Sequence, residues 1–354
     1  MGKRAVKKYF SFMCLIITAL VMILTFIGLY GGNANPVGNT AQAMLVYALP
    51  ILIIANVVIL IFWLIRLRWI WSLMPLITLL CCVRYIGAWY QVFGGGENSD
   101  NKQVVTVATY NVASFGKEAS RYIAQDILTE MKQQQVDVLC MQEYSETSGD
   151  QKNSDLFSEY FKYKAFGNHD MVIFSKYPIT LSKTLKFEYT NNSALWADVY
   201  INGKVLRVFN VHMETTGINR TLHVAAKAMN NGYDVSGSRL LSAIYGNYMM
   251  GMNIRAGQAI TVSNEMRESD KPIIVAGDFN DVPYSYVYNT LLGNLKDGFR
   301  DCGKGFGSTF RGGKKQVRID YIFYDKNIKG VDYFKSNLTY SDHVPVFCRM
   351  VLDQ

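Results

Sequence analysis

Acidic residues are absent from the first 96 positions of this 354-residue chain, which nevertheless contain seven Lys and Arg. The remaining positions carry 29 basic side chains and all 28 Asp and Glu, so the formal net charge of +8 arises almost wholly from the N-terminal part. A basic excess of this size would normally favour nucleic-acid binding. Here it belongs to an apolar segment, and the near-neutral remainder argues against strong non-specific binding of duplexes, which requires many phosphate contacts.

Cysteine pairs with metal-binding or redox spacing are also missing, since none of the six cysteines forms a CxxC motif. Cys14, Cys81 and Cys82 fall in apolar runs, where cysteine acts as a small hydrophobic residue. Cys302 and Cys348 can pair in an oxidising compartment or remain free thiols, and the sequence leaves both alternatives open. No internal repeat is visible, which argues against a solenoid or a propeller.

Apolar sequence is abundant near the N-terminus, in three runs at residues 9–30, 43–65 and 69–93. Each run is long enough to cross a hydrocarbon core of ~30 Å at ~1.5 Å per residue. Buried core helices are one alternative, and a cleaved signal peptide is another for the first run. Three runs in tandem argue against core helices, and the second and third would anchor the chain even if the first were removed.

The positive-inside rule predicts how these runs cross the membrane. Four basic residues precede position 9 and place the N-terminus in the cytoplasm, while Arg66 and Arg68 predict a short cytoplasmic hairpin. The third span then puts the remaining chain outside the cytoplasm, in the periplasm if the cell is Gram-negative. We expect a three-helix membrane anchor at residues 1–93, a linker at 94–102 and a soluble domain at 103–354.

The soluble domain alternates strand and helix patterns. Asn202-Gly203 between two strand patterns predicts a hairpin with a type I′ turn. Mixed hairpins, buried strands and helices over this length predict two packed sheets flanked by helices. We expect strands at 104–110, 136–141, 171–175, 194–201, 205–212, 272–276, 318–323 and 344–352, and helices at 119–134, 254–267 and 284–292.

Residues 217–252 have the character of an insertion, rich in Met and aromatic residues. An accessory packed helix is the simplest interpretation of this segment. A lid over a cleft, or a contact with the membrane, is the alternative that its composition allows.

Acid, amide and imidazole side chains recur at the ends of the apolar strands. Strand ends are where a rigid sheet presents side chains to a cleft. Each residue alone is weak evidence, because Asn and Asp at strand ends usually form turns and a single His is usually structural. The set, in one order along the chain, predicts a site that comprises Asn111, Glu143, His212, Asp278, Asn280, Asp320, Asp342 and His343.

These residues sit in motifs that resemble the endonuclease/exonuclease/phosphatase (deoxyribonuclease I-like) superfamily, here in a membrane-anchored member. The resemblance spans nearly all of residues 103–354 and implies that they form the catalytic domain, a four-layer α/β sandwich, preceded by three transmembrane helices. The motifs, in family order, are Thr109-Tyr-Asn111, Met141-Gln-Glu143, Ile173-Phe-Ser-Lys-Tyr-Pro178, Asn210-Val-His212, Gly277-Asp-Phe-Asn280, Arg318-Ile-Asp-Tyr-Ile322 and Ser341-Asp-His343.

The resemblance implies a metal-dependent phosphoesterase. Glu143, with Asn111 beside it, would hold Mg²⁺ or Mn²⁺, since hard oxygen ligands suit these cations. Asp342 would help to hold the metal or would orient His343.

The remaining residues would act on the phosphate, again as the resemblance implies. His343 would be the general base or a charge clamp on the phosphoryl group. Asp278 and Asn280 would position the nucleophile and bind a non-bridging oxygen, and His212 would hydrogen-bond the phosphate or assist the leaving group. Asp320 would support a histidine.

The stretch before residue 172 departs from the family pattern, because His169-Asp170-Met171 stands where many members have a glycine. Asp170 can orient a catalytic histidine or can simply end a loop, and we adopt the loop as the simpler interpretation. The substrate is expected to be a phosphate ester of a nucleic acid or of a lipid headgroup. A catalytically silent membrane-bound scaffold is the rival interpretation, and the oligomeric state is not predicted.

Overall fold

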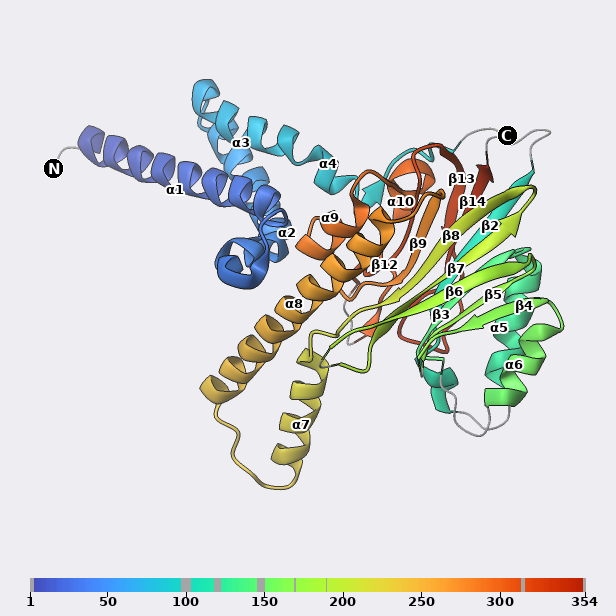
Figure 1. Cartoon of the computed structure of the whole chain (residues 1–354). Coiled ribbons are helices and arrows are strands. Elements are labelled where there is room, and N and C mark those ends of the chain that lie inside the picture. The colour runs from blue at the N-terminus through green and yellow to red at the C-terminus, as the bar shows by residue number, and fades with distance from the viewer. Residues whose placement is uncertain are drawn as a thin grey trace. The chain divides into compact units, whose positions relative to one another are not determined.

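The computed structural model describes residues 3–96, 103–117, 122–144, 150–168, 170–188, 190–312 and 316–352. Most of the predicted linker, residues 97–102, and His169 lie outside these ranges. The chain divides into two compact units, one formed by Met1–Ala88 with Pro283–Asn289 and the other by Trp89–Val282 with Thr290–Gln354 (Figure 1).

The N-terminal unit is helical. It contains α1 (Lys3–Gly31), α2 (Pro36–Ile65), α3 (Trp69–Cys81) and α4 (Val83–Ile86). Two helical segments, Val6–Gly31 and Pro36–Ile65, are long and apolar enough to cross a membrane. The third apolar run forms only the 13-residue α3 before α4 begins. At ~1.5 Å per residue α3 rises roughly 20 Å, so it does not by itself confirm the predicted third span.

Helices α1 and α2 contact each other through polar pairs as well as apolar packing. The Asn56 side-chain nitrogen donates to the Thr25 hydroxyl over 2.9 Å, and the Trp63 indole donates to the Thr18 hydroxyl over 2.9 Å. These four side chains are buried, whereas large apolar side chains of the same helices are exposed. This inversion of the usual globular pattern is typical of helices that pair in an apolar solvent.

The second unit contains two six-stranded sheets, with strand orders β10-β12-β9-β8-β7-β6 and β13-β14-β2-β3-β5-β4. Strands β8 and β9 run parallel, as do β2 and β3, while the other neighbours are antiparallel. The first sheet comprises β6 (Ile179–Lys186), β7 (Ser193–Ile201), β8 (Lys204–His212), β9 (Ile273–Asp278), β10 (Lys296–Asp297) and β12 (Asp320–Tyr324). The second comprises β2 (Val104–Asn111), β3 (Val138–Gln142), β4 (Tyr163–Phe166), β5 (Val172–Ser175), β13 (Ile328–Lys335) and β14 (Val346–Leu352).

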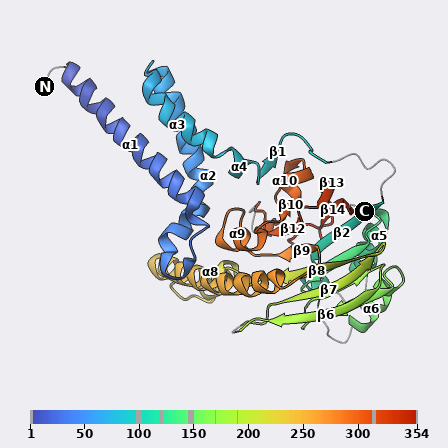
Figure 2. The same ribbon diagram turned by 45° about the horizontal axis from the view of Figure 1, so that its top comes forward.

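Helices cover the outer faces of the two sheets, which gives four layers (Figures 1 and 2). Val107, Val208 and Ile274 are among the buried residues that fill the space between the sheets. A second core lies between the second sheet and its helices, around Phe157 and Phe174. The helices are η1 (Ala113–Lys117), α5 (Tyr122–Gln133), α6 (Asp150–Ser158), α7 (Ile218–Asn230), α8 (Gly237–Arg267), α9 (Tyr286–Leu292) and α10 (Gly298–Cys302), and a small ribbon pairs β1 (Tyr90–Gln91) with β11 (Gly305–Phe306).

This architecture confirms the predicted four-layer α/β sandwich. The turn at Asn202 and Gly203 has positive φ at both residues, 53° and 87°, as a type I′ hairpin requires. Cys302 and Cys348 are both buried free thiols. The expectation of an accessory packed helix in the insertion holds only from Gly251 onward, because the buried residues of α8 begin there.

A buried amide network joins the two sheets at their centre. The Gln142 side-chain nitrogen, on β3, donates to the Asn210 side-chain oxygen, on β8, over 2.7 Å. The Asn210 side-chain nitrogen donates in turn to the carbonyls of Met141 and Val172 over 2.8 and 2.9 Å. Asn210 is fully buried. Buried polar groups are stabilising only when they are paired, so this network fixes how the two sheets align.

Removing the Asn210 side chain should destabilise the fold. Asn210→Ala leaves two backbone carbonyls and the Gln142 amide without their partner, at a cost of about 2–4 kcal/mol. Urea unfolding of the full chain measures the loss. Asn327→Ala, at an exposed position, is the matched control and should leave the unfolding midpoint unchanged. Equal midpoints for the two variants would contradict this role for Asn210.

Candidate active site

Strand topology brings the ends of several strands to one edge of the sandwich. His212, at the end of β8, is in register with Asp278, at the end of β9, and Asp278 is in register with Asp320, at the start of β12. On the other sheet, Asn111 ends β2 beside Gln142, which ends β3. The polar residues predicted at strand ends therefore converge from both sheets.

His343 lies between two buried aspartates. Its Nδ1 is 3.0 Å from Asp320 Oδ1, and its Nε2 is 3.6 Å from Asp278 Oδ2. The Phe310 ring packs edge-on against the imidazole, with ring centroids 4.9 Å apart. The Thr309 hydroxyl accepts from the backbone N–H of Asp320 and so fixes the start of β12. These contacts leave Nε2 as the functional end of His343.

Asn111 connects the acidic groups of the two sheets. Its side-chain nitrogen donates to Glu143 Oε1 over 3.0 Å and to Asp278 Oδ2 over 3.1 Å. Its side-chain oxygen accepts from the backbone N–H of Ala113 over 3.1 Å. In this orientation Asn111 positions two carboxylates, and its predicted role as a metal ligand stays a prediction.

His212 forms a second histidine–aspartate pair. Its Nδ1 is 2.8 Å from Asp170 Oδ2, and its Nε2 is 3.9 Å from Glu143 Oε1. Asp170 therefore does more than end a loop, because it also holds His212. Its position just before β5 was the signal, because β5 and β3 are paired and Asp170 therefore lies beside Glu143.

Asn280 and Asp342 border this group. The Asn280 backbone N–H donates to Asp278 Oδ1 over 2.8 Å, and its side chain donates to the Met213 carbonyl over 2.9 Å. Asp342 Oδ1 is 4.0 Å from His343 Nε2. Glu143 and Asn280 both have positive φ, 51° and 50°. Strained backbone of this kind persists where the surroundings hold it, which is common at functional sites.

Helix α8 holds the two loops that follow β8 and β9. The buried Arg255 guanidinium donates to Asp281 Oδ2 over 3.2 Å and to the Glu214 carbonyl over 3.2 Å. The Gln258 side-chain oxygen accepts from the backbone N–H of Glu214 over 2.9 Å. Glu214 follows His212 by two residues and Asp281 adjoins Asn280, so α8 clamps both sides of the group.

Burial and neighbouring charges have opposing effects on the pKa values of Asp278, His343 and His212. Burial raises the pKa of Asp278 to about 6, although the charge of His343 opposes the rise. Burial alone would lower the pKa of His343, but the charges of Asp320, Asp278 and Asp342 outweigh it and raise that pKa to about 10. For His212, burial is likewise outweighed, chiefly by the hydrogen bond to Asp170, and its pKa is raised. At neutral pH the His343 imidazole is therefore a cation that faces carboxylates, and the raised pKa of His212 shifts that ring in the same direction.

The donor set fits a hard divalent cation. Ligand atoms of Asp278, Asp320 and His343 lie within 4.8 Å of one another, but His343 Nδ1 is already occupied by Asp320. The side chains of Glu143 and Asp342 are 43% and 50% exposed. Exposed carboxylates leave room for the waters that Mg²⁺ retains, so these two suit a cation better than the buried cluster does.

Comparison with known families identifies the fold. The endonuclease/exonuclease/phosphatase family model matches residues 108–343, which include all the residues described above. The chain belongs to this family. It is therefore a phosphoesterase, as the motifs predicted. A second model, described as a domain of unknown function (DUF8431), matches residues 8–89.

Solved structures agree on the fold. A Bacteroides vulgatus endonuclease/exonuclease/phosphatase matches with 17% identity and a TM-score of 0.53, covering 71% of this chain and 100% of that one. D. rerio TDP2 complexed with a single-strand DNA product matches with 16% identity and a TM-score of 0.52, covering 70% and 99%. A search of curated protein sequences gives no match.

Replacing Asp170 should alter His212 and slow the enzyme. Asp170→Asn removes the charge that favours the imidazolium, so the pKa of His212 falls, and turnover drops roughly tenfold or more as the ring loses its orientation. Titration of the imidazole by NMR and measurement of kcat test both effects. Asp155→Asn, on the exposed face of α6, is the control. An unchanged His212 titration would remove Asp170 from this role.

Proposed function

We propose that this chain is a divalent-metal-dependent hydrolase of phosphodiester bonds that is anchored in a membrane. The observation that carries the proposal is the pair of histidines whose Nε2 atoms face Asp278 and Glu143 across the junction of the two sheets. Two imidazole donors, of which His343 is a cation, and two carboxylates at this spacing suit a tetrahedral phosphoryl group, whose charge grows in the transition state.

Asp278 acts on the attacking water. Its raised pKa, about 6, makes the carboxylate a base that is matched to neutral pH. Asn111 and Asn280 donate to Asp278 and fix its direction. His343, held as a cation by Asp320, then stabilises the phosphoryl oxygens, which favours the charge-clamp alternative over the general base. His212, held by Asp170, donates to the phosphate or to the leaving group.

Glu143 and Asp342 would hold Mg²⁺ or Mn²⁺, with Asn111 orienting Glu143. The cation would supply positive charge to the phosphoryl group and an oriented set of waters. The catalytically silent scaffold is disfavoured, because a scaffold has no need for two buried histidine–aspartate pairs.

A membrane-proximal phosphodiester, such as a lipid headgroup, is the substrate class that an anchored enzyme would meet at high local concentration. The D. rerio TDP2 structure contains a single-strand DNA product, which makes a single-stranded nucleic acid the second candidate. The near-neutral charge of residues 97–354 favours the first over a duplex.

The anchor is proposed to cross the membrane three times and to place the catalytic unit outside the cytoplasm. Cys82 keeps a helical conformation between α3 and α4, so Trp69–Cys81, Cys82 and Val83–Ile86 rise together. At ~1.5 Å per residue this stretch spans roughly 27 Å, close to the thickness of a hydrocarbon core. Such a length supports a third crossing.

A reporter fused to the C-terminus tests this topology. Alkaline phosphatase should be active there and green fluorescent protein dark, because the third span carries the C-terminus out of the cytoplasm. Fusions after residue 67, between the second and third spans, are the control and should give the opposite pattern. A fluorescent C-terminal fusion would limit the anchor to two spans and put the catalytic unit in the cytoplasm.

Hydrolysis of bis(p-nitrophenyl) phosphate by the full chain tests the proposed chemistry. Activity should require Mg²⁺ or Mn²⁺ and should be lost in Asp278→Ala and His343→Ala. Glu143→Gln should raise the metal concentration for half-maximal activity about tenfold or more, because a neutral amide binds Mg²⁺ poorly. Glu159→Gln, on the surface, should titrate like the wild type. Wild type and His343→Ala that are equally inactive with every metal and phosphate ester would favour the scaffold.

The pH dependence of kcat/KM should be bell-shaped. Activity rises as Asp278 loses its proton near pH 6 and falls as His343 loses its proton near pH 10. A bound divalent cation stabilises the deprotonated forms and shifts both limbs to lower pH. Asp320→Asn removes the charge that most favours the His343 cation and should move the alkaline limb down further. A profile whose alkaline limb is unmoved by Asp320→Asn would contradict the assignment of that limb to His343.

A further inference from the structure

Helix α7 and the first half of α8 form a hairpin that projects beyond the sheets (Figure 1). The buried residues of α8 begin at Gly251, so no residue in the half from Gly237 to Met250 is buried. Along α7, Ala225 is the one buried residue among those whose side chains are described. The hairpin is therefore held by its base, while its sides and tip are surrounded by solvent.

The exposed surface of this hairpin is strongly apolar. A helix in water normally turns its apolar stripe toward a core, and a cluster of large exposed apolar side chains marks a surface that contacts something else. Here the large side chains are between 42% and 70% exposed: Leu222, Val224, Met229, Tyr233, Leu241, Tyr245 and Met250. This is too many on one hairpin to be scattered surface residues.

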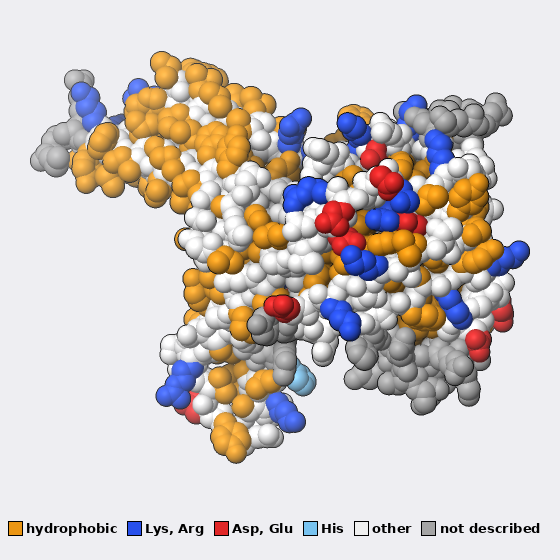
Figure 3. Space-filling view, viewed as in Figure 1, with side chains coloured by type: hydrophobic (Ala, Val, Ile, Leu, Met, Phe, Trp, Pro, Cys, Tyr) orange, Lys and Arg blue, Asp and Glu red, His pale blue; other side chains and the backbone are white. Residues whose placement is uncertain are grey.

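Basic residues accompany the apolar ones. Between residues 218 and 250 the sequence contains Arg220, Lys227 and Arg239 but a single acidic residue, Asp234. The rest of the catalytic unit is close to neutral, so the positive charge is concentrated on the hairpin. Figure 3 shows apolar and basic side chains together on this projecting lobe, at its lower left. Apolar residues flanked by Lys and Arg match an anionic lipid surface.

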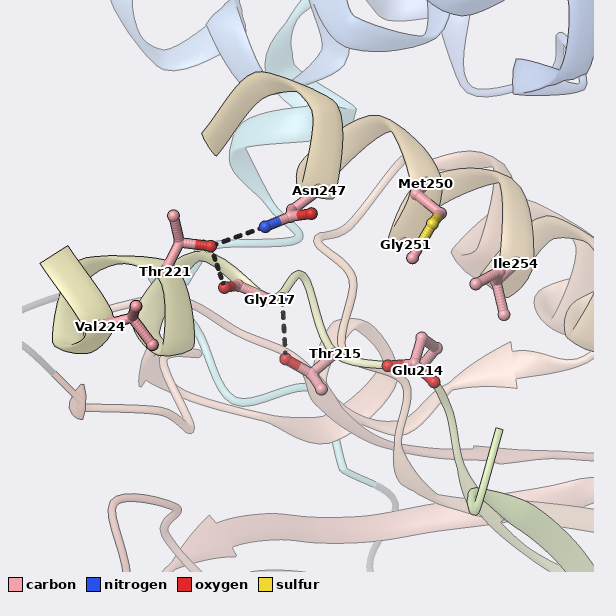
Figure 4. A pocket seen from close by; sticks show the side chains of 9 residues that line it. All are labelled: Glu214, Thr215, Gly217, Thr221, Val224, Asn247, Met250, Gly251 and Ile254. Atoms are coloured by element: carbon pink, nitrogen blue, oxygen red, sulfur yellow. Dashed lines mark hydrogen bonds between the residues drawn. The ribbon is translucent and has the colours of Figure 1, made fainter. Parts of the chain in front are cut away.

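The base of the hairpin is open on its inner side. A cavity of about 400 Å³ lies between α7, α8 and the loop after β8 (Figure 4). Val224, Met250 and Ile254 form its apolar wall, and the Asn247 side chain bridges the two helices by donating to the Thr221 hydroxyl over 2.8 Å. Glu214 lines the same cavity two residues after His212. The cavity therefore lies beside the loop that follows His212.

We propose that the α7–α8 hairpin docks the catalytic unit onto the surface of a bilayer that contains anionic lipids. A bilayer is the surface that the hairpin would contact, because the proposed membrane anchor holds the catalytic unit close to one. Only Gly87 and Ala88 separate the end of α4 from Trp89, where the catalytic unit begins. The three Cα–Cα steps from Ile86 to Trp89 span at most roughly 11 Å. The inference rests on the proposed membrane anchor, and it adds a second lipid contact that brings the active site to the headgroups.

Spin labelling of the full chain in proteoliposomes tests the docking. In a Cys14→Ser, Cys81→Ser background, one nitroxide is placed at Leu241→Cys and a matched one at Leu181→Cys, an exposed apolar position on β6. The label at 241 should collide severalfold more with oxygen than with a water-soluble nickel chelate, relative to the label at 181. Adding phosphatidylglycerol to phosphatidylcholine vesicles should widen the difference.

Two outcomes overturn the docking. One is a label at 241 that stays as accessible to the nickel chelate as the label at 181 in both vesicle types. The other is dipolar broadening between labels at 241, which would show that a second copy of the chain covers the hairpin instead.

A second variant distinguishes a failure of the proposed docking from a failure of the proposed hydrolase activity or of the membrane anchor. Leu241→Asp with Tyr245→Asp should abolish the lipid contact of a label at Met229→Cys while leaving hydrolysis of soluble bis(p-nitrophenyl) phosphate unchanged. Flotation of the full chain with vesicles reports the anchor alone. A label at 241 that enters lipid in a chain that hydrolyses nothing supports docking and contradicts only the proposed activity. An unchanged lipid contact in the double Asp variant overturns docking.

Discussion

The alignment of the two sheets against each other is the constraint on which the site depends. Each decisive contact joins one sheet to the other: Asn111 to Asp278, His343 to Asp320, and Asp170 to His212. A sheet that slid by one residue along its partner, roughly 3.3 Å, would take all of these contacts beyond hydrogen-bonding distance at once. The buried bond from Gln142 to Asn210 lies directly beneath these contacts and opposes such a slip. The motif residues between the catalytic ones therefore build the site without taking part in the chemistry.

The predicted strands were those at the centres of the sheets, and the missed ones lie at the edges. Strands β4, β6, β10 and β13 are the four outer strands, and none was predicted. Central strands are buried on both faces and leave a continuous apolar run in the sequence. Edge strands keep a polar face, as the exposed run of β6 shows, and resemble loops. In the site, motif order revealed the residues at central strand ends, whereas Asp170 had no motif and depended on the pairing of β3 with β5.

The electrostatics of the site follow from the burial of several neighbouring carboxyl groups away from water. Asp278 and Asp320 are each 1% exposed, and two such carboxylates beside each other are costly unless cations compensate them. His343 supplies one cation, and the half-exposed Glu143 and Asp342 leave space for another from solution. A phosphoryl group thus enters a region whose charges are already arranged, which avoids reorganisation during the reaction.

Helix α8 has two parts that differ in burial and in role, and Gly251 is the first buried residue of the second part. C-terminal to Gly251, Arg255 and Gln258 hydrogen-bond the loops that carry the active-site residues. Substitutions of these two residues should therefore disturb catalysis. N-terminal to it, from Gly237 to Met250, no residue is buried, so substitutions there are expected to change what the enzyme contacts more than how it reacts. Because both halves belong to one continuous helix, substitutions in its exposed half can change the surface that the protein contacts without altering the active site.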